Sequence, residues 1–368
     1  MYFCNYIDYC RKSLCKSKIC IKMTFENKIE AAVQEMFDRI SFAEQPAGLY
    51  DPLRYMIRIG GKRIRPKLCL TTYSLFCDNF SSEIEEPALG LEIFHSFTLM
   101  HDDIMDRSPL RRGRETVWKK WNEDTAILSG DAMLIEAYRR IARTPQPALP
   151  KVLDLFTDTA AQVCEGQQMD MEFESRDMVE MIEYEQMIGL KTACLLACSA
   201  EVGALVAGAG KAECDALYNY GYQLGMAFQI ADDYLDAFGD EKVFGKPIGG
   251  DIINCKKSWL TVRAIEKAGE KAIEKAGGKA SAKASEKASE TSNLLNILDS
   301  QVLTDEEKAA KIALVKKIYV ELGVDKDARQ AIESYSEKAM ESLAGLGLSH
   351  MKEEALRRFA DHLIGRVK

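Results

Sequence analysis

Residues 97–106 read Phe-Thr-Leu-Met-His-Asp-Asp-Ile-Met-Asp, and residues 228–236 read Phe-Gln-Ile-Ala-Asp-Asp-Tyr-Leu-Asp. Each stretch places an Asp-Asp-x-x-Asp pattern inside an otherwise apolar helical sequence. In an α-helix the first and last Asp of this pattern share one face, roughly 6 Å from each other. Carboxylates at this spacing destabilise a helix unless something cationic offsets their repulsion.

Divalent metal ions would offset that repulsion. An acidic helix face is usually just solvated, but here two such faces have core-like flanks and the same pattern. Mg²⁺ characteristically binds one or two carboxylates together with waters and substrate phosphate. We therefore predict that the two motifs face each other and hold one diphosphate through bridging metal ions, with these ligands: Asp102, Asp103, Asp106, Asp232, Asp233 and Asp236.

The rest of the chain predicts an all-α fold. Of its 368 residues, 47% are hydrophobic, which is enough apolar material for a sizeable core. Apolar residues recur at helical spacing, for example at Ile29, Val33 and Met36. Alternating strand patterns with turn signals are missing from the sequence, so we expect essentially no sheet. Near the C-terminus, a helix is expected to begin at Asp305 and to end at Gly323.

Two segments differ from this pattern. Residues 267–292 repeat Lys, Ala, Glu and Ser with almost no large apolar side chains, which predicts a solvated insertion between core helices. Met23 directly precedes the first helical pattern, so residues 1–22 are expected to be a flexible leader or a mis-assigned start. The leader lacks the apolar region of a secretory signal. We expect one domain over residues 23–368.

Charge and cysteine content limit the function. The net charge of −8 argues against general affinity for nucleic acid or anionic membrane. The eleven cysteines are scattered, so reduced thiols in a cytoplasmic protein are the simplest interpretation. No run approaches the roughly 18 apolar residues needed to span a bilayer.

Basic residues suited to phosphate groups stand near both acidic motifs. Gly60 and Gly61 precede Lys62, Arg63 and Arg65, and glycines allow the backbone to approach a ligand closely. Other cations follow along the chain, and His95 lies two helical turns before the first motif. Each of these groups is ambiguous by itself: Arg111, Arg112, Arg114, Lys191, Lys246 and Lys256.

With these residues in view, the chain resembles the trans-isoprenyl diphosphate synthases, which include farnesyl and geranylgeranyl diphosphate synthases. The resemblance covers roughly residues 25–365 apart from the insertion. It rests on several motifs in the order of the family: GGKRIRP (60–66), HDDIMD (101–106), RRG (111–113), GDAML (130–134), GQQMDMEF (166–173), KTA (191–193), FQIADDYLD (228–236) and FGKPIGGDI (244–252).

The resemblance implies a single-domain bundle of about a dozen helices around a deep central pocket, usually in a homodimer. It implies three Mg²⁺ ions on an allylic diphosphate, with catalytic roles for Asp102, Asp103, Asp106, Lys191 and Asp232. Further contacts to this diphosphate would come from Arg111, Lys191, Thr192, Gln229, Lys246 and Lys256. The co-substrate isopentenyl diphosphate would be bound by Lys62, Arg65, His95 and Arg112.

The residues just before the first motif concern product length. In this family the positions four and five before the motif help to set pocket depth, and here they are Thr98 and Phe97. A ring about 7.5 Å down the helix from Asp102 would act as a floor. The pair resembles the geranylgeranyl (C20) type, with farnesyl (C15) as the next choice.

Two other functions have to be weighed against the synthase. A class I terpene cyclase also ionises a prenyl diphosphate, but it should carry an Asn/Ser/Glu-type second metal motif and lack the cations for isopentenyl diphosphate. A non-catalytic regulatory subunit should have lost aspartates from a motif, whereas all six are present. Both alternatives therefore fit the sequence less well.

Overall fold

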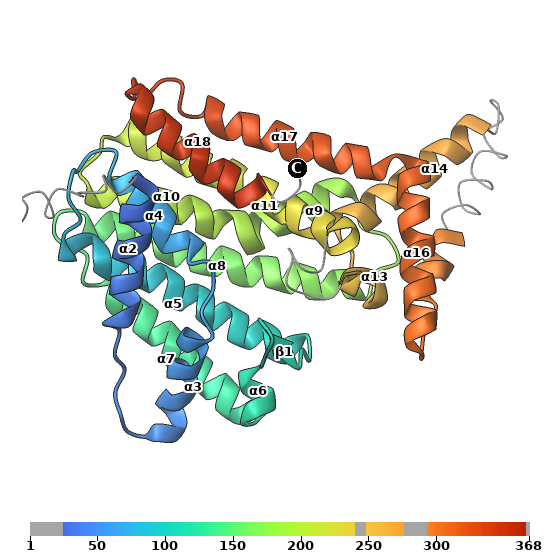
Figure 1. The fold of residues 1–368 in the computed structure, drawn as a ribbon, viewed down its shortest axis with the longest axis horizontal. Coiled ribbons are helices and arrows are strands. Elements are labelled where there is room, and N and C mark those ends of the chain that lie inside the picture. Colours follow the sequence, from blue (N-terminus) through green and yellow to red (C-terminus); the bar gives the residue numbers. More distant parts are fainter. Residues whose placement is uncertain (1–24, 240–247, 276–292, 366–368) are drawn as a thin grey trace, which may run out of the picture. The chain divides into compact units, whose positions relative to one another are not determined.

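The computed structural model describes residues 25–239, 248–275 and 293–365 (Figure 1). It divides into two units, residues 1–40 and residues 41–368. The predicted domain beginning at residue 23 thus spans both units. In the first unit, α2 (Phe25–Asp38) carries the predicted apolar face of Ile29, Val33 and Met36. The predicted leader, residues 1–22, lies outside the described residues.

Helices form most of the second unit, which confirms the all-α prediction. Residues 293–299 form one further helix. The elements are, in chain order, α3 (Ala47–Arg58), α4 (Ile64–Tyr73), α5 (Ser82–Met105), α6 (Val117–Lys120), α7 (Glu123–Ile141), α8 (Leu149–Glu174), α9 (Met181–Ile188), the π-helix η1 (Gly189–Ala193), α10 (Cys194–Val206), α11 (Lys211–Phe238), α13 (Gly250–Ile253), α14 (Trp259–Lys275), α16 (Asp305–Leu322), α17 (Val324–Glu341) and α18 (His350–Ile364).

A short hairpin follows α5 within this otherwise helical part of the chain. Strand β1 (Leu110–Arg111) pairs with β2 (Arg114–Glu115) in antiparallel fashion. The loop residues Arg112 and Gly113 have φ values of 53° and 71°, as in a type I′ turn. Strands of two residues are too short to produce an alternating pattern, so the sequence carried no sign of them.

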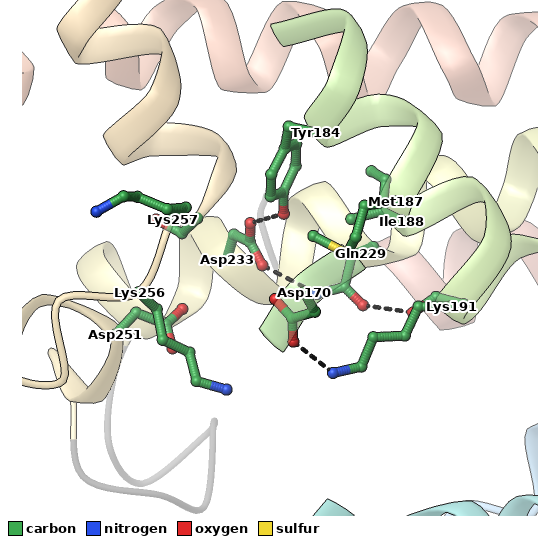
Figure 2. Close-up of a pocket in the computed structure, with 12 residues that line it drawn as sticks. Asp170, Tyr184, Met187, Ile188, Lys191, Gln229, Asp233, Asp251, Lys256 and Lys257 are labelled. Carbon is green, nitrogen blue, oxygen red and sulfur yellow. Dashed lines mark hydrogen bonds and ion pairs between the residues drawn. The ribbon is translucent and has the colours of Figure 1, made fainter. Parts of the chain in front are cut away.

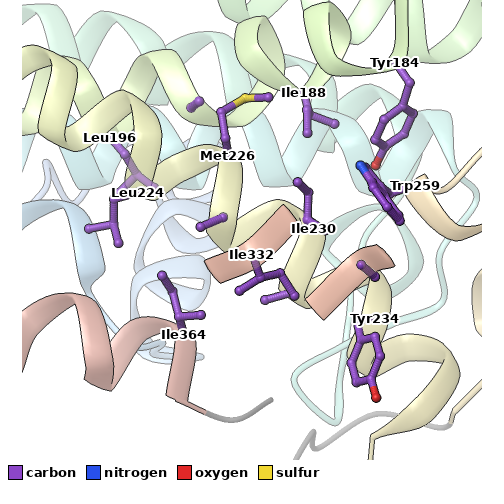
Figure 3. Close-up of a cluster of buried hydrophobic side chains, with 14 of the residues drawn as sticks. Tyr184, Ile188, Leu196, Leu224, Met226, Ile230, Tyr234, Trp259, Ile332 and Ile364 are labelled. Atoms are coloured by element: carbon purple, nitrogen blue, oxygen red, sulfur yellow. The ribbon is translucent and has the colours of Figure 1, made fainter. Parts of the chain in front are cut away.

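The core of the second unit centres on α10 and α11, which pack against each other along their lengths (Figure 1). Helix α10 is apolar on nearly every side, and such a helix is stable only when neighbours surround it. It is enclosed by α4, α5 and α8, while α17 covers α11. Figure 3 shows the buried side chains at this centre, among them Leu196, Leu224, Met226, Ile230, Ile332 and Ile364.

One stretch, Met181–Val206, is long and apolar enough to cross a membrane, contrary to the expectation from the sequence. It reaches this length because α9, η1 and α10 continue from one to the next without a break. Of its most apolar window, 72% is buried inside the structure. The stretch therefore lies in the core of the helical fold.

In the C-terminal part, the predicted bounds of one helix are confirmed, and the first residues of the predicted insertion lie in a helix. Helix α16 begins at Asp305, where Thr304 and Glu307 form a capping box, and it ends before Gly323 as predicted. Helix α14, however, continues to Lys275, so the predicted insertion at 267–292 begins within a helix. Ala268 is buried, and Lys267 Nζ lies 2.7 Å from a carboxylate oxygen of Asp327. Residues 276–292 lie outside the described part of the chain.

The half-buried Glu201 of α10 makes stability depend on pH. Burial and the nearby Asp215 raise its pKa from 4.5 to about 7, and Lys211 offsets only part of this. The folded protein therefore keeps a proton on Glu201 that the unfolded chain releases between about pH 4.5 and 7. Stability must fall as the pH rises through that range.

We expect Glu201→Gln to remove this fall of stability with rising pH, because glutamine does not ionise. Between pH 5 and 8 the native chain should lose about 1–2 kcal/mol more unfolding free energy than the variant. Urea unfolding at both pH values measures the difference. The exposed Glu337→Gln is the matched control and should behave like the native chain. Equal pH dependence in all three proteins would contradict the assignment.

Candidate functional site

The first acidic motif lies at the end of α5. Asp102 and Asp103 are in its last turn, and Asp106 is the C-cap residue. Asp103 is buried, while Asp102 and Asp106 are half-buried. The hairpin places Arg111 against this motif: its Nε donates to both carboxylate oxygens of Asp103 at 2.8 and 2.9 Å, and its Nη2 lies 3.4 Å from Asp102 Oδ2. Asp103 is thus paired with Arg111 and buried, whereas the outer two aspartates remain half-buried.

Two lysines bring positive charge to the same motif from distant elements. Lys191 of η1 donates to Asp170 of α8 at 2.6 Å and lies 3.4 Å from Asp102 Oδ1. Lys256, just before α14, donates to Asp106 Oδ2 at 3.2 Å. Burial lowers the pKa of both ammonium groups, but the surrounding carboxylates outweigh it and raise the pKa overall. Both lysines are therefore charged at neutral pH.

The second acidic motif lies in the last two turns of α11. Asp232 and Asp236 are half-buried, whereas Asp233 is buried. Asp236 Oδ2 accepts the backbone N–H of Asp251 at 3.0 Å, which fixes the start of α13. Asp233 accepts hydrogen bonds from the Tyr184 hydroxyl, the Trp259 backbone N–H at 2.7 Å, and Gln229 Nε2 at 3.0 Å. These donors lower its pKa, but burial dominates and raises it to about 6.

A cavity of about 110 Å³ lies between these elements (Figure 2). Its polar wall carries carboxylates and lysines, and its apolar wall carries Met187 and Ile188. Thr192 donates to Gln229 Oε1 at 2.9 Å across one side of it. The lining residues are Asp170, Tyr184, Met187, Ile188, Lys191, Thr192, Gln229, Asp233, Asp251, Lys256, Lys257 and Ser258. The cavity thus joins the second motif to the lysines that contact the first.

The metal-binding role of the six aspartates stays a prediction. In the part of the chain that the structure describes, no three His, Cys, Asp or Glu side chains come together as ligands of one ion. Asp103 and Asp233 are instead bound by protein donors. The half-buried Asp102 and Asp106 still suit a hard cation, since Mg²⁺ needs only one or two carboxylates when phosphate and water complete its shell.

The predicted residues for isopentenyl diphosphate form a second cluster, which is strongly basic. The pKa of His95 is lowered by burial and by four arginines: Arg65, Arg112, Arg111 and Arg63. Burial also lowers the pKa of Arg65 to about 10, and its Nε has no hydrogen-bond partner among the described residues. The Arg112 guanidinium packs over Gly61, where a Cβ would lie 2.5 Å from its Nη1. Cations crowded in this way favour a bound anion.

The remaining predicted residues divide into three cases. Lys62 Nζ lies 5.7 Å from the ring centre of Phe228, on the helix of the second motif. Thr98 is half-buried, and its hydroxyl donates to the His95 carbonyl at 2.8 Å. Phe97 is buried beside Phe94, with ring centres 5.6 Å apart. Lys246 lies outside the described residues.

A π-helix explains how Lys191 and Thr192 reach the cavity. Residues 189–193 form one wide turn between α9 and α10, and such turns change the direction of the side chains they carry. Gly166 of α8 lies directly against this turn: a Cβ there would be 2.3 Å from the Lys191 backbone nitrogen. Gly225 of α11 lies against Ala193 in the same way, at 2.5 Å. Both glycines are needed for the close approach of these backbones.

Sequence reasoning assigned no role to several residues at this site, notably Asp170, Tyr184 and Asp251. Asp170 had a usable signal, because it stands four residues after Gly166 in GQQMDMEF and so shares the face that packs on η1. No sequence signal indicated a role for Tyr184, because a tyrosine at helical spacing in an apolar segment is usually a core residue.

Comparison with known proteins identifies the relatives of this arrangement. The polyprenyl synthetase family model matches residues 46–296. A geranylgeranyl diphosphate synthase of Methanosarcina mazei is 37% identical over 241 residues, covering 65% of this chain and 73% of that protein. The crystal structure of a geranylgeranyl pyrophosphate synthase superposes with a TM-score of 0.83 at 38% identity, covering 93% of this chain and 99% of that one.

A second solved structure carries bound ligands. The polyprenyl synthase of Caulobacter crescentus CB15, complexed with calcium and isoprenyl diphosphate, is 26% identical with a TM-score of 0.77. The match covers 93% of this chain and 95% of that one.

Proposed function

The chain belongs to the polyprenyl synthetase family, and from this premise we propose how its residues divide the work of a short-chain trans-prenyl diphosphate synthase. We propose that it condenses isopentenyl diphosphate with an allylic diphosphate by ionisation, condensation and elimination, and that geranylgeranyl diphosphate is its main product. One observation carries the proposal: Lys191 and Lys256 link the first acidic motif to the cavity that Asp233 and Gln229 line.

Divalent ions are part of this proposal. The family uses divalent metal ions, and the Caulobacter relative was solved with calcium and isoprenyl diphosphate. The outer aspartates of both motifs are half-buried carboxylates, so we assign Asp102, Asp106, Asp232 and Asp236 as the ligands of Mg²⁺, with three ions expected per allylic diphosphate. Bound ions would supply Lewis-acid stabilisation of the diphosphate as it leaves.

The protein's own groups prepare the same step. The charged Lys191 and Lys256 stabilise negative charge that develops on the departing diphosphate when the allylic C–O bond breaks. Oxygen atoms of Thr192 and Gln229 line the cavity, and their negative dipoles suit an allylic cation. Met187 and Ile188 help to exclude water, which would otherwise capture that cation.

The second cluster would hold the co-substrate. Arg65, Arg112 and Lys62 provide positive charge, and the lowered pKa of His95 keeps its ring neutral, so that it donates one N–H without adding repulsion. The isopentenyl double bond would then attack the allylic carbon. A carbon–carbon bond forms and a proton is lost, for which the released diphosphate is the proposed acceptor.

We further propose a homodimer in the cytoplasm. Helix α7 exposes Ile127, Leu128 and Ile135, whose spacing forms an apolar stripe suited to an equivalent helix of a second copy. Sedimentation velocity should give about twice the chain mass of 41.3 kDa, and a monomer would contradict the proposal. The cysteines in the described ranges are free, which supports a reducing compartment.

The function is tested by incubating purified protein with isopentenyl diphosphate and each allylic primer, with and without Mg²⁺. We expect longer prenyl diphosphates only when Mg²⁺ is present. Asp102→Asn should lower kcat by about 10²–10³-fold, since it removes charge at the site of C–O cleavage. The exposed Asp154→Asn on α8 is the matched control and should retain full activity.

The same assay separates the alternatives. A terpene cyclase would convert an allylic diphosphate to hydrocarbon without isopentenyl diphosphate, and a regulatory subunit would be inactive alone. Undiminished turnover by Asp102→Asn would contradict the proposed role of the first motif.

Product length is predicted to depend on Phe97. Its ring belongs to an aromatic block in which Phe94 and Phe156 are 5.2 Å apart and Phe156 and Tyr138 are 5.0 Å apart. Phe97→Ala should open space at this block and lengthen the product by one or more five-carbon units. The space left by the missing ring should also lower the free energy of unfolding by about 3–5 kcal/mol. Chromatography of dephosphorylated products measures the length.

The partly exposed Phe76→Ala serves as the control and should leave the product unchanged. If Phe97→Ala folds and yields the native product length, Phe97 is not the floor.

A further inference from the structure

The buried carboxylate of Asp233 joins three separate parts of the cavity wall. Its Oδ2 accepts the Tyr184 hydroxyl from α9 and the Trp259 backbone N–H at the first residue of α14. Its Oδ1 accepts Nε2 of Gln229, one turn earlier on α11. Figure 2 shows Tyr184 and Gln229 meeting Asp233 from different sides. Only 6% of Asp233 is exposed, so its oxygens serve protein donors and not solvent.

Each donor belongs to a segment that carries a residue lining the cavity. Gln229 lines it itself, and its Oε1, which is proposed to face the allylic cation, also accepts the Thr192 hydroxyl. Tyr184 precedes Lys191 by seven residues on the continuous α9–η1 helix. Trp259 follows Lys256 by three residues, so anchoring its N–H fixes the end of the segment from which Lys256 reaches Asp106.

The hydrogen bonds also decide the orientation of the Gln229 amide. Asp233 Oδ1 can only accept, so Nε2 must face it and Oε1 must face Thr192 and the cavity. This orientation lasts only while the carboxylate keeps its own position. Tyr184 and Trp259, both donating to the other oxygen, hold the carboxylate plane in place.

We propose that Tyr184 is a positioning residue for prenyl transfer: it fixes Asp233, which orients Gln229 and anchors the Lys256 segment, and Asp233 is a structural acceptor and not a metal ligand. This inference rests on the proposed function of the cavity. It replaces the prediction, made from the Asp-Asp-x-x-Asp pattern alone, that all three aspartates of the second motif bind metal.

Tyr184→Phe tests the proposal because it removes only the hydroxyl. The matched control is Tyr220→Phe, since Tyr220 is equally buried, lies on the same helix as Asp233 and donates to the Leu356 carbonyl at 2.8 Å, outside the cavity. Both variants lose one buried hydrogen bond, so both should lower the melting temperature by similar amounts. Only Tyr184→Phe should lower kcat, by about tenfold, with KM for isopentenyl diphosphate within twofold of the native value.

Two further measurements separate positioning from a general loss of stability. In a Gln229→Leu background, Tyr184→Phe should change kcat less than twofold, because the amide it orients is gone. Of the three tryptophans, Trp118 and Trp121 can be changed to Phe, which leaves Trp259 as the sole reporter. Its emission maximum should shift with Tyr184→Phe and remain constant with Tyr220→Phe.

Metal binding gives an independent test. With inorganic pyrophosphate as the probe, electron paramagnetic resonance of Mn²⁺ should count the same number of bound ions in Asp233→Asn as in the native protein. Asp232→Asn should bind fewer. Loss of an ion in Asp233→Asn would overturn the structural assignment, and equal kcat values for Tyr184→Phe and Tyr220→Phe would overturn the positioning role.

Failure of the proposed function would look different. In that case the native protein would not join isopentenyl diphosphate to any primer, whereas the Trp259 emission would still report whether Tyr184 orders the start of α14. A constant emission maximum in an active enzyme would contradict the inference alone.

Discussion

Electrostatic repulsion between carboxylates in an apolar helix bundle is the constraint on which the rest of this structure depends. Asp102, Asp103 and Asp106 crowd the end of α5, and Asp170 of α8 lies nearby. Burial makes such repulsion costly because water no longer screens it. Cations from three other elements offset this repulsion: Arg111 of β1, Lys191 of η1 and Lys256 before α14. These contacts fix where the hairpin, the π turn and the start of α14 must lie.

Close backbone packing makes those positions possible. Lys191, which contacts two carboxylates, lies in the wide π turn η1, and η1 approaches α8 and α11 closely because Gly166 and Gly225 have no side chains. A π turn is less favourable than a regular α-helical turn. The packing of α10, which is buried on almost every side, stabilises the chain around it. Charge placement at the cavity is therefore a consequence of apolar packing elsewhere.

The sequence predicted the helical class because the 3.6-residue period is a local property of each segment. The structure places Arg65, His95 and Arg112 together, and their assignment to isopentenyl diphosphate stays a prediction. The hairpin was missed because two-residue strands have no periodicity. The first residues of the predicted 267–292 insertion lie in α14, where Lys267 pairs with Asp327 of α17 and Ala268 is buried, and composition does not record such tertiary contacts.

The two motifs share an arrangement of buried and half-buried carboxylates that the linear pattern does not reveal. In each, the middle Asp follows the first by one residue, which rotates it by about 100° around the helix axis, while the last Asp returns to the face of the first. The outer positions are then left half-buried while the middle one is buried. Asp103 and Asp233 are indeed the buried members, held by Arg111 and by Tyr184, Trp259 and Gln229. An Asp-Asp-x-x-Asp helix thus carries two kinds of carboxylate: an outer pair suited to bind ions, and a middle one that fastens the helix end to its neighbours.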